Sequence, residues 1–179
     1  MFENNWRTFS DVDISNLYET LDKIILDLFK IGFSRSKMKF IVACDSHVHK
    51  THITYCTSIV FVKEGKGGNI FNKKEIVEFE NKPTNLSNTE YNKWVKQLAR
   101  ERLWNECMKS VECAKTLDKF LAQYGLKVSE IHSDVNVNKK YLSYDLLSAI
   151  NGYVTGSQYI SVVKPQSWAA TNIADYKTK

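Results

Sequence analysis

The sequence contains no apolar run that approaches the ~18 residues of a membrane-spanning helix. Its first residues, MFENNWRTFSD, lack the basic-then-apolar order of a signal peptide. It also has no internal repeat, low-complexity tract or linker. These absences predict a cytoplasmic protein without a membrane partner. They also predict one domain over residues 1–179, whose hydrophobic content of 43% suffices for a real core.

Cysteine is limited to four residues, and none of them stands in a CxxC spacing: Cys44, Cys56, Cys107 and Cys113. They lie within apolar or helical patterns, which favours buried, reduced thiols over a disulfide or zinc framework. A P-loop is lacking too, because EGKGG at 64–68 does not have the GxxxxGK[ST] spacing and leads into a predicted strand. The formal charge of +5 permits nucleic-acid binding without arguing for it.

The chain is organised around KFIVACDSHVHK, from Lys39 to Lys50. Its apolar run predicts a strand that is buried on both faces and ends at Asp45. A carboxylate at such a position is costly to bury unless a positive or hydrogen-bonding partner meets it. We expect this partner to be a divalent metal ion, because downstream elements can bring further carboxylates to the same place.

An amphipathic helix is predicted before this strand, because apolar residues recur at three- and four-residue spacing from Ile14 to Leu28 and Gly32 follows. It belongs to an N-terminal helical extension, residues 1–37, which we expect to pack on the domain. After the strand, His52–Lys63 and Asn69–Glu80 predict two more strands, which complete an antiparallel meander. Charged residues mark the third strand as an edge: Lys73, Lys74 and Glu78.

A long helix is predicted from about Asn88 to Tyr124, where Gly125 ends it. Its apolar face shifts along the helix, which indicates a kink, a break or a change of packing partner near residues 99–102. Leu126–Ser133 then predicts a fourth strand that ends in Asp134.

The rest of the chain predicts a helix, a strand and a short terminal helix. The helix covers Tyr141–Tyr153 and is expected to close at Gly152, and the strand covers Tyr159–Val163. This order of elements is that of a ribonuclease H-like fold. The predicted class is therefore α/β, with a five-stranded mixed sheet of three antiparallel and then two parallel strands, flanked by helices and carrying an extra N-terminal helix.

In that fold the first and fourth strands are parallel neighbours, so Asp45 and Asp134 would emerge side by side. A third acid is expected from the long helix, which runs antiparallel to the fourth strand. A strand advances ~3.3 Å per residue and a helix ~1.5 Å per residue, so the helix needs about twice as many residues to cover the length from Gly125 to Asp134. Counting that many residues back from Gly125 gives about position 105. Glu106 satisfies this count and Glu101 is its rival. The alternative is that both glutamates are solvated or paired with neighbouring basic residues.

The sequence resembles the YkuK-like ribonuclease H-like family of bacteria and their phages. The family motifs IxGTDSQVHK, REKxxxET, HxD and KPxSxxASxxADKxTK correspond here to IVACDSHVHK, RERLWNEC, HSD and KPQSWAATNIADYKTK. The resemblance covers nearly the whole chain after Lys37. It implies that four residues form an acidic cluster with catalytic and metal-binding roles: Asp45, Glu106, Asp134 and Asp175. His47 and Cys44 depart from the family pattern beside this cluster.

Such acids suit Mg²⁺ or Mn²⁺, and two such ions can activate a water and stabilise the leaving oxygen of a phosphodiester. The predicted function is therefore a metal-dependent nuclease that acts on RNA, DNA or a hybrid by a two-metal mechanism. The alternative is a non-catalytic nucleic-acid-binding or regulatory module that keeps the fold. Seven residues near the acids are expected to contact substrate: Ser46, His47, His49, His132, Lys164, Trp168 and Lys177. A zinc site formed by His47, His49 and His52 is a weaker alternative, because it lacks a fourth ligand.

Overall fold

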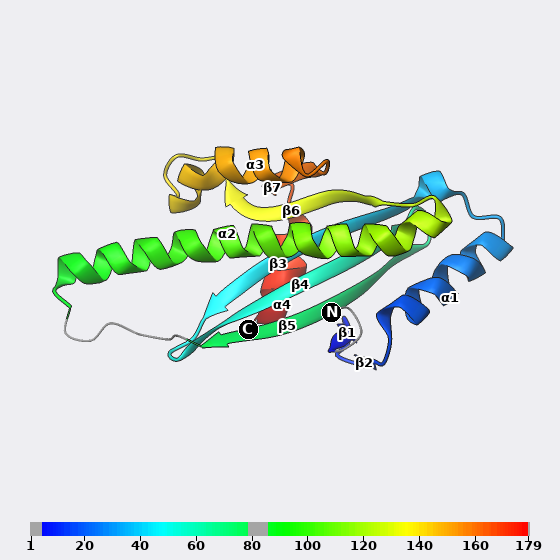
Figure 1. Cartoon of the computed structure of the whole chain (residues 1–179), viewed down its shortest axis with the longest axis horizontal. Coiled ribbons are helices and arrows are strands. Elements are labelled where there is room, and N and C mark those ends of the chain that lie inside the picture. The colour runs from blue at the N-terminus through cyan, green and yellow to red at the C-terminus, as the bar shows by residue number, and fades with distance from the viewer. Residues whose placement is uncertain (1–4, 79–85, 179) are drawn as a thin grey trace.

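The computed structural model describes residues 5–78 and 86–178. Within them, seven strands form one mixed sheet in the order β2-β1-β5-β4-β3-β6-β7 (Figure 1). The strands are β1 (Trp6–Thr8), β2 (Asp13–Ile14), β3 (Met38–Val48), β4 (His52–Lys63), β5 (Gly67–Glu78), β6 (Val128–Asn136) and β7 (Ile160–Lys164). The helices are α1 (Leu17–Lys30), α2 (Asn88–Leu121), α3 (Leu147–Gly156) and α4 (Asp175–Thr178). A π-helical stretch, Ala169–Ala174, runs into α4, and we call residues 169–178 the C-terminal helix.

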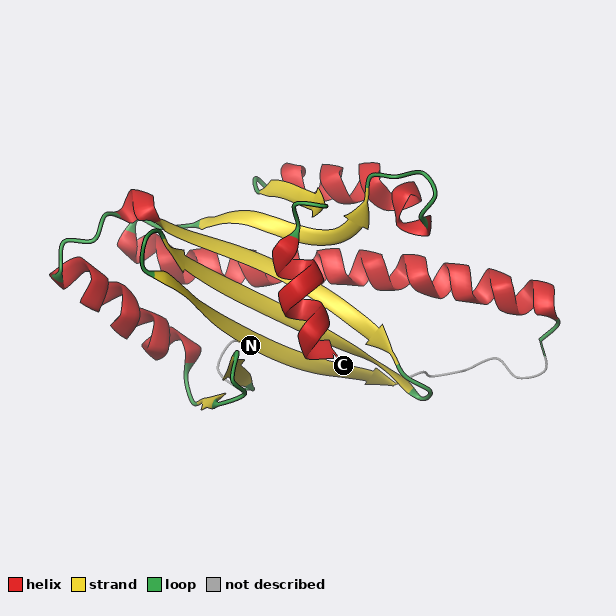
Figure 2. Cartoon of the chain, turned by 180° about the vertical axis from the view of Figure 1, so that it is seen from behind, coloured by secondary structure: helices red, strands yellow, loops and turns green. Residues whose placement is uncertain are grey.

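The pleat of β3 divides the core between the two faces of the sheet. Val42 lies in the large core formed with α1, α2 and α3, whereas Ala43 packs against the C-terminal helix. Figure 2 shows this helix alone across the back of the sheet. Because side chains alternate along a strand, Asp45 faces the same side as Ala43, and Ser46 faces the same side as Val42. Two adjacent residues of β3 thus point into different layers.

α2 begins with a capping box, in which Ser87 and Glu90 satisfy each other's backbone N–H groups. The helix then runs unbroken for 34 residues, about 51 Å. Its buried residues begin at Glu106, and the part before them projects beyond the sheet (Figure 1). The expected irregularity near residues 99–102 is therefore a change of packing partner in a continuous helix. We call residues 88–101 the α2 overhang.

The meander, the long helix, the fourth strand and the parallel pairing of β3 with β6 and β6 with β7 agree with the predictions. The strand count was wrong, because β1 and β2 extend the sheet from five strands to seven. The third predicted strand is covered by β1 only from Phe71 to Lys73, so the edge prediction is wrong for Lys73, while no strand of the described residues pairs with residues 74–78 on that side. Residues 79–80, its expected end, lie outside the described part of the chain.

Two helix ends follow the predicted glycines and one does not. Gly32 and Gly125 adopt φ values of 71° and 65°, which end α1 and the 3₁₀ turn after α2. Gly152 instead lies inside α3, which continues to Gly156. No helix in the described ranges is long and apolar enough to cross a membrane. Residues 6–30 add β1, β2 and α1 to the same sheet and core, and the assignment of the whole chain to one domain stays a prediction.

Candidate active site

Two aspartates lie where the central parallel strands part. The last regular β3–β6 pair is Ala43 with His132, and Asp45 and Asp134 each stand two residues further along. By the pleat they are level with each other and face the C-terminal helix. The prediction that β3 ends at Asp45 was wrong, because its pairing with β4 continues to Val48. What ends there is the pairing with β6.

Glu106 reaches the same place from the opposite layer. It is 4% exposed on α2, and its Oε1 accepts a hydrogen bond of 2.5 Å from Oγ of Ser46. Asp45, the neighbour of Ser46 on β3, faces the other layer but is near enough for its charge to raise the pKa of Glu106. Glu101 is exposed instead and accepts a hydrogen bond from Gln97 of its own helix. The structure therefore brings Glu106, and not Glu101, to the paired aspartates.

Burial and mutual repulsion change the acidity of this cluster. Burial, followed by the charge of Asp134 and then that of Asp175, raises the pKa of Asp45 to about 7. Burial likewise raises the pKa of Glu106 to about 8, with the charge of Asp45 as the next cause. All four predicted acids thus interact electrostatically around Asp45. Asp175, the first residue of α4, is half-buried.

Two basic side chains, Arg102 and Lys164, lie beside the acids. Arg102 lies one turn before Glu106 on α2 and donates from Nη1 to the backbone oxygen of Ser46 at 3.2 Å. Its charge opposes the rise in pKa of both Asp45 and Glu106. Lys164, at the end of β7, places Nζ 2.6 Å from Oδ1 of Asp134. The site is therefore a mixed-charge centre with an excess of acids.

The donor set has the chemistry that Mg²⁺ and Mn²⁺ prefer, since it consists of carboxylate oxygens. In the described residues, however, no three His, Cys, Asp or Glu side chains are grouped closely enough to hold a metal ion. The intramolecular bonds explain this spacing. Glu106 is turned toward Ser46, and Asp134 is bonded to Lys164 and to the hydroxyl of Thr171. The carboxylates are therefore suitable ligands for a cation. Binding one would require some of these hydrogen bonds and ion pairs to be replaced by bonds to the metal.

His132 takes a different position from the one expected of a substrate contact. It is 1% exposed, and its Nδ1 accepts a hydrogen bond from the backbone N–H of Ala169. The ring proton is therefore on Nε2, which donates to Glu130 at 3.0 Å. Burial lowers the pKa of His132, while Glu130 acts against that change. His132 thus fastens the start of the C-terminal helix to β6, and contact with substrate would require this packing to open.

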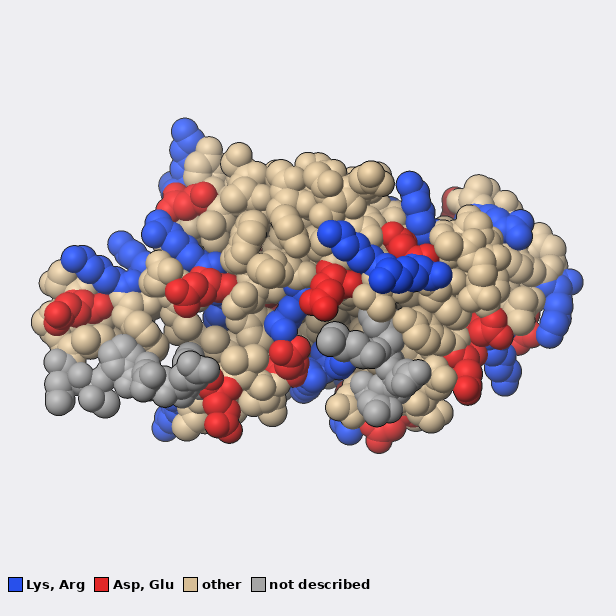
Figure 3. Space-filling model, viewed as in Figure 1, with Lys and Arg blue, Asp and Glu red and all other residues tan. Residues whose placement is uncertain are grey.

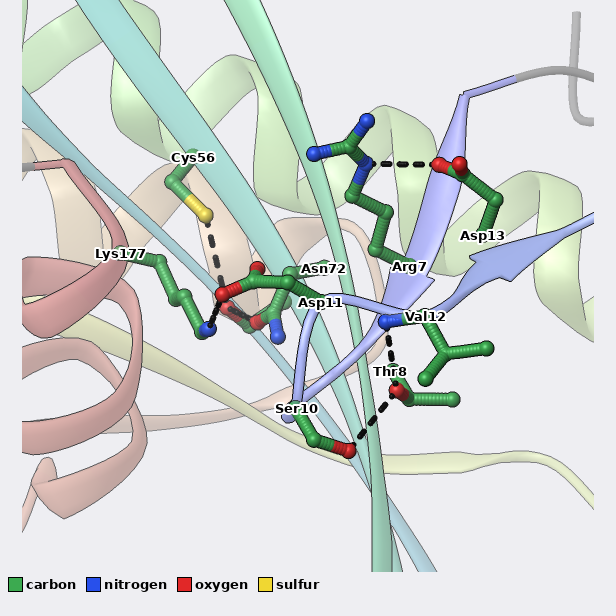
Figure 4. A network of polar contacts seen from close by, with 10 residues as sticks. Arg7, Thr8, Ser10, Asp11, Val12, Asp13, Cys56, Asn72 and Lys177 are labelled. Carbon is green, nitrogen blue, oxygen red and sulfur yellow. Dashed lines mark hydrogen bonds and ion pairs between the residues drawn. The ribbon is translucent and has the colours of Figure 1, made fainter.

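Lys177 also has a structural position. It is 5% exposed, and its Nζ lies 2.8 Å from Oδ2 of Asp11, in the turn between β1 and β2. Figure 4 shows this side chain reaching Asp11 beside Asn72 of β5. Its ammonium group also lies 4.9 Å from the centre of the Phe9 ring. Lys177 therefore anchors the helix that carries Asp175.

The other predicted contacts differ in accessibility. His47 is exposed and Trp168 is 40% exposed, its ring edge-on to His132. His47, His49 and His52 gather at the tip of the β3–β4 hairpin, with ring centres 4.9 and 4.5 Å apart. The rings of His49 and His52 stack. Among the described residues, no group of three His, Cys, Asp or Glu side chains is placed to hold a metal ion. The zinc alternative is therefore not supported.

Sequence reasoning missed Arg102 and Thr171 as members of the site. Arg102 had a usable signal, because residues four apart share a helix face and Glu106 was already a candidate. Thr171 gave no signal, since its contact with Asp134 depends on where the C-terminal helix crosses the sheet.

The fold and the acids define an α/β protein of the ribonuclease H-like class. In agreement, residues 23–179 match the model of the family described as Ribonuclease H-like, and the chain belongs to this family. This confirms the family that the motifs predicted, while a bacterial or phage origin stays a prediction. No curated protein and no solved structure gives a significant match.

Proposed function

We propose that the chain is a metal-dependent nuclease, or a related phosphodiester-processing enzyme, that acts on nucleic acid. The observation that carries this proposal is the pair of buried carboxylates, Asp45 and Glu106: burial raises the pKa of both, the charge of Asp134 raises that of Asp45, and the charge of Asp45 raises that of Glu106. Buried like charges are unfavourable unless a cation compensates them. Membership of the ribonuclease H-like family supports nucleic acid as the substrate.

Asp45, Glu106, Asp134 and Asp175 would hold Mg²⁺ or Mn²⁺. When bound, such ions activate a water molecule and stabilise the leaving oxygen of a phosphodiester. The chain itself orients the acids: Ser46 holds Glu106, and the C-terminal helix sets the position of Asp175. Arg102 and Lys164 supply positive charge beside the acids, where a substrate phosphate would be neutralised. Exposed His47 and Trp168 are available for contacts with flanking nucleotides.

The second candidate is a non-catalytic module that binds nucleic acid or regulates another protein. It is favoured by the ion pair between Lys164 and Asp134, because an internal cation already neutralises one of the acids. A module of this kind would use the fold and the basic residues without a bound metal.

Cleavage assays separate the two candidates. Labelled single-stranded DNA and RNA, duplex DNA and RNA–DNA hybrid are each incubated with Mg²⁺, Mn²⁺ or chelator. We expect metal-dependent cleavage that is lost in Asp45→Asn and kept in Glu101→Gln, whose carboxylate is exposed outside the cluster. If no substrate is cut, and Asp45→Asn binds them all as the wild type does, the binding-module function is correct instead.

A further inference from the structure

A groove lies between the α2 overhang and the end of β3. Tyr91, Trp94 and Leu98 of α2 line one side, and Val48 of β3 and His49, which follows it, line the other. Leu98 packs on a buried cluster of β3 and β4 side chains, which fixes the floor of the groove to the sheet. The apolar residues of the α2 overhang therefore line this groove, and of them Leu98 packs on the core.

The α2 side of the groove presents aromatic surface. Tyr91 is 51% exposed and Trp94 is half-buried, with their ring centres 5.9 Å apart. Val95 and Val48 are also exposed next to them. The two rings are inclined by 38° to each other, and the exposed ring of Tyr91 can stack with a planar ligand such as a nucleobase.

One end of the groove adjoins the acidic cluster. Arg102 lines the groove and donates to the backbone oxygen of Ser46, whose hydroxyl is bonded to Glu106. The described lining includes this guanidinium and the imidazole of His49 but no carboxylate. On the overhang, Lys93 and Lys96 are exposed, and Figure 3 shows Lys and Arg side chains along this part of the molecule with some Asp and Glu between them. The charge of the groove therefore complements an anionic ligand.

We infer that this groove binds a single strand of nucleic acid, with bases on Tyr91 and Trp94 and a phosphate at Arg102, and directs the strand toward the acids. The inference rests on the proposed function and names its substrate class. Bases in a duplex are already stacked on their neighbours, so only unpaired bases can lay a face on these rings. From Tyr91 to Arg102 the helix spans about 16 Å, which leaves room for more than one nucleotide.

The test measures binding in chelator, so that no cleavage occurs. A fluorescein-labelled oligothymidylate and a duplex of the same length are titrated with wild type, Tyr91→Ala, Trp94→Ala and Val95→Glu. We expect the wild type to prefer the single strand and each variant to bind it about tenfold more weakly, since stacking contributes ~1–3 kcal/mol per base. Trp94→Phe keeps a ring and should restore most of the affinity. Because Tyr91 and Val95 are exposed, their variants test the groove even if Trp94→Ala folds poorly.

Tyr141→Ala is the matched control, because Tyr141 is 56% exposed but lies outside the groove. Equal affinity for single strand and duplex, or the same loss in Tyr141→Ala as in Tyr91→Ala, would overturn the inference. So would a wild-type dimer that Val95→Glu dissociates, because a second copy of the chain would then fill the groove. If the wild type cuts substrates while groove variants bind normally, only this inference fails. If groove variants lose binding and no metal supports cleavage, only the proposed enzyme activity fails.

Discussion

Nζ of Lys164, at the end of β7, lies 2.6 Å from Oδ1 of Asp134 on β6. Thr171 donates to the same oxygen from the C-terminal helix at 3.2 Å. One of the four acids is thus held by an internal cation at the place where we propose that a divalent ion binds. Metal binding to Asp134 therefore competes with Lys164.

Replacing Lys164 by Met removes this competitor. We expect Mn²⁺ to bind about fivefold more tightly, because a partly exposed ion pair contributes up to ~1 kcal/mol. Isothermal titration with Mn²⁺ measures the change. Lys39→Met is the control, since it breaks the ion pair with Glu130 outside the acidic cluster. Unchanged or weaker Mn²⁺ binding in Lys164→Met would show that the ammonium does not compete.

The stability of the metal-free protein should depend on pH through Asp45 and Glu106. Their folded pKa values, about 7 and about 8, exceed ordinary carboxyl values near 4. Between about pH 4 and pH 8 the folded state therefore binds more protons than the unfolded chain. The stability that protonation of the pair contributes is therefore lost as pH rises through this window. Above the window, this contribution no longer changes with pH.

Melting curves in chelator from pH 5 to pH 8.5 measure this dependence. We expect the wild-type melting temperature to fall toward pH 8, and to fall less in Asp45→Asn, which removes one charge of the pair. If the two proteins lose stability equally over this range, Asp45 does not carry the raised pKa.

Glu106→Gln and Glu101→Gln test which helical glutamate belongs to the cluster. At pH 8 in chelator, the buried glutamate is under repulsion from Asp45, so an amide at 106 should raise the melting temperature by about 2–4 °C, equivalent to ~1 kcal/mol for a chain of this size. The exposed change at 101 should leave it within about 1 °C. Differential scanning calorimetry measures both, and a larger gain in Glu101→Gln would contradict the assignment.

The anchor of the C-terminal helix offers a matched pair of substitutions. Asp11→Asn leaves the buried ammonium of Lys177 without its ion pair, which should destabilise the packing of the C-terminal helix. Asp13→Asn breaks only the exposed pair with Arg7, which contributes under ~1 kcal/mol.

Amide hydrogen exchange measures how much each substitution loosens the C-terminal helix. Amides of the C-terminal helix should exchange faster in Asp11→Asn than in Asp13→Asn, because only the first contact fastens that helix. Equal protection of residues 169–178 in both variants would mean that Lys177 does not hold the helix.

Much of the fold was predictable because its main elements are long and periodic. The strands from Met38 to Glu78 and the helix α2 carry alternating or helical apolar patterns, and glycines mark several of their ends. β1 and β2 were missed because strands of three and two residues are too short to show a period. The pairing of β1 also covers Lys73 of β5, so one of the charges that indicated an edge lies beside another strand.

The candidate site was predictable where residues follow from strand register. Asp45, Asp134 and Glu106 interact electrostatically because two parallel strands and one antiparallel helix fix their relative heights. The burial of Lys177 could not be predicted, because its partner Asp11 lies 166 residues away in the sequence. Asp11 also precedes residues 23–179, the range of the family match. The N-terminal segment thus adds a support for Asp175 from outside that range.

Melting curves of wild type and Asp134→Asn, each with chelator and with millimolar Mg²⁺ or Mn²⁺ at constant ionic strength, test most directly whether the four acids form a cation site. A ligand that binds only the folded state stabilises it by RT ln(1 + [L]/Kd), about 2.7 kcal/mol at 100 times Kd. We predict a rise of about 5–10 °C for the wild type. In Asp134→Asn we predict no rise with metal. Equal rises in the two proteins would contradict the metal site.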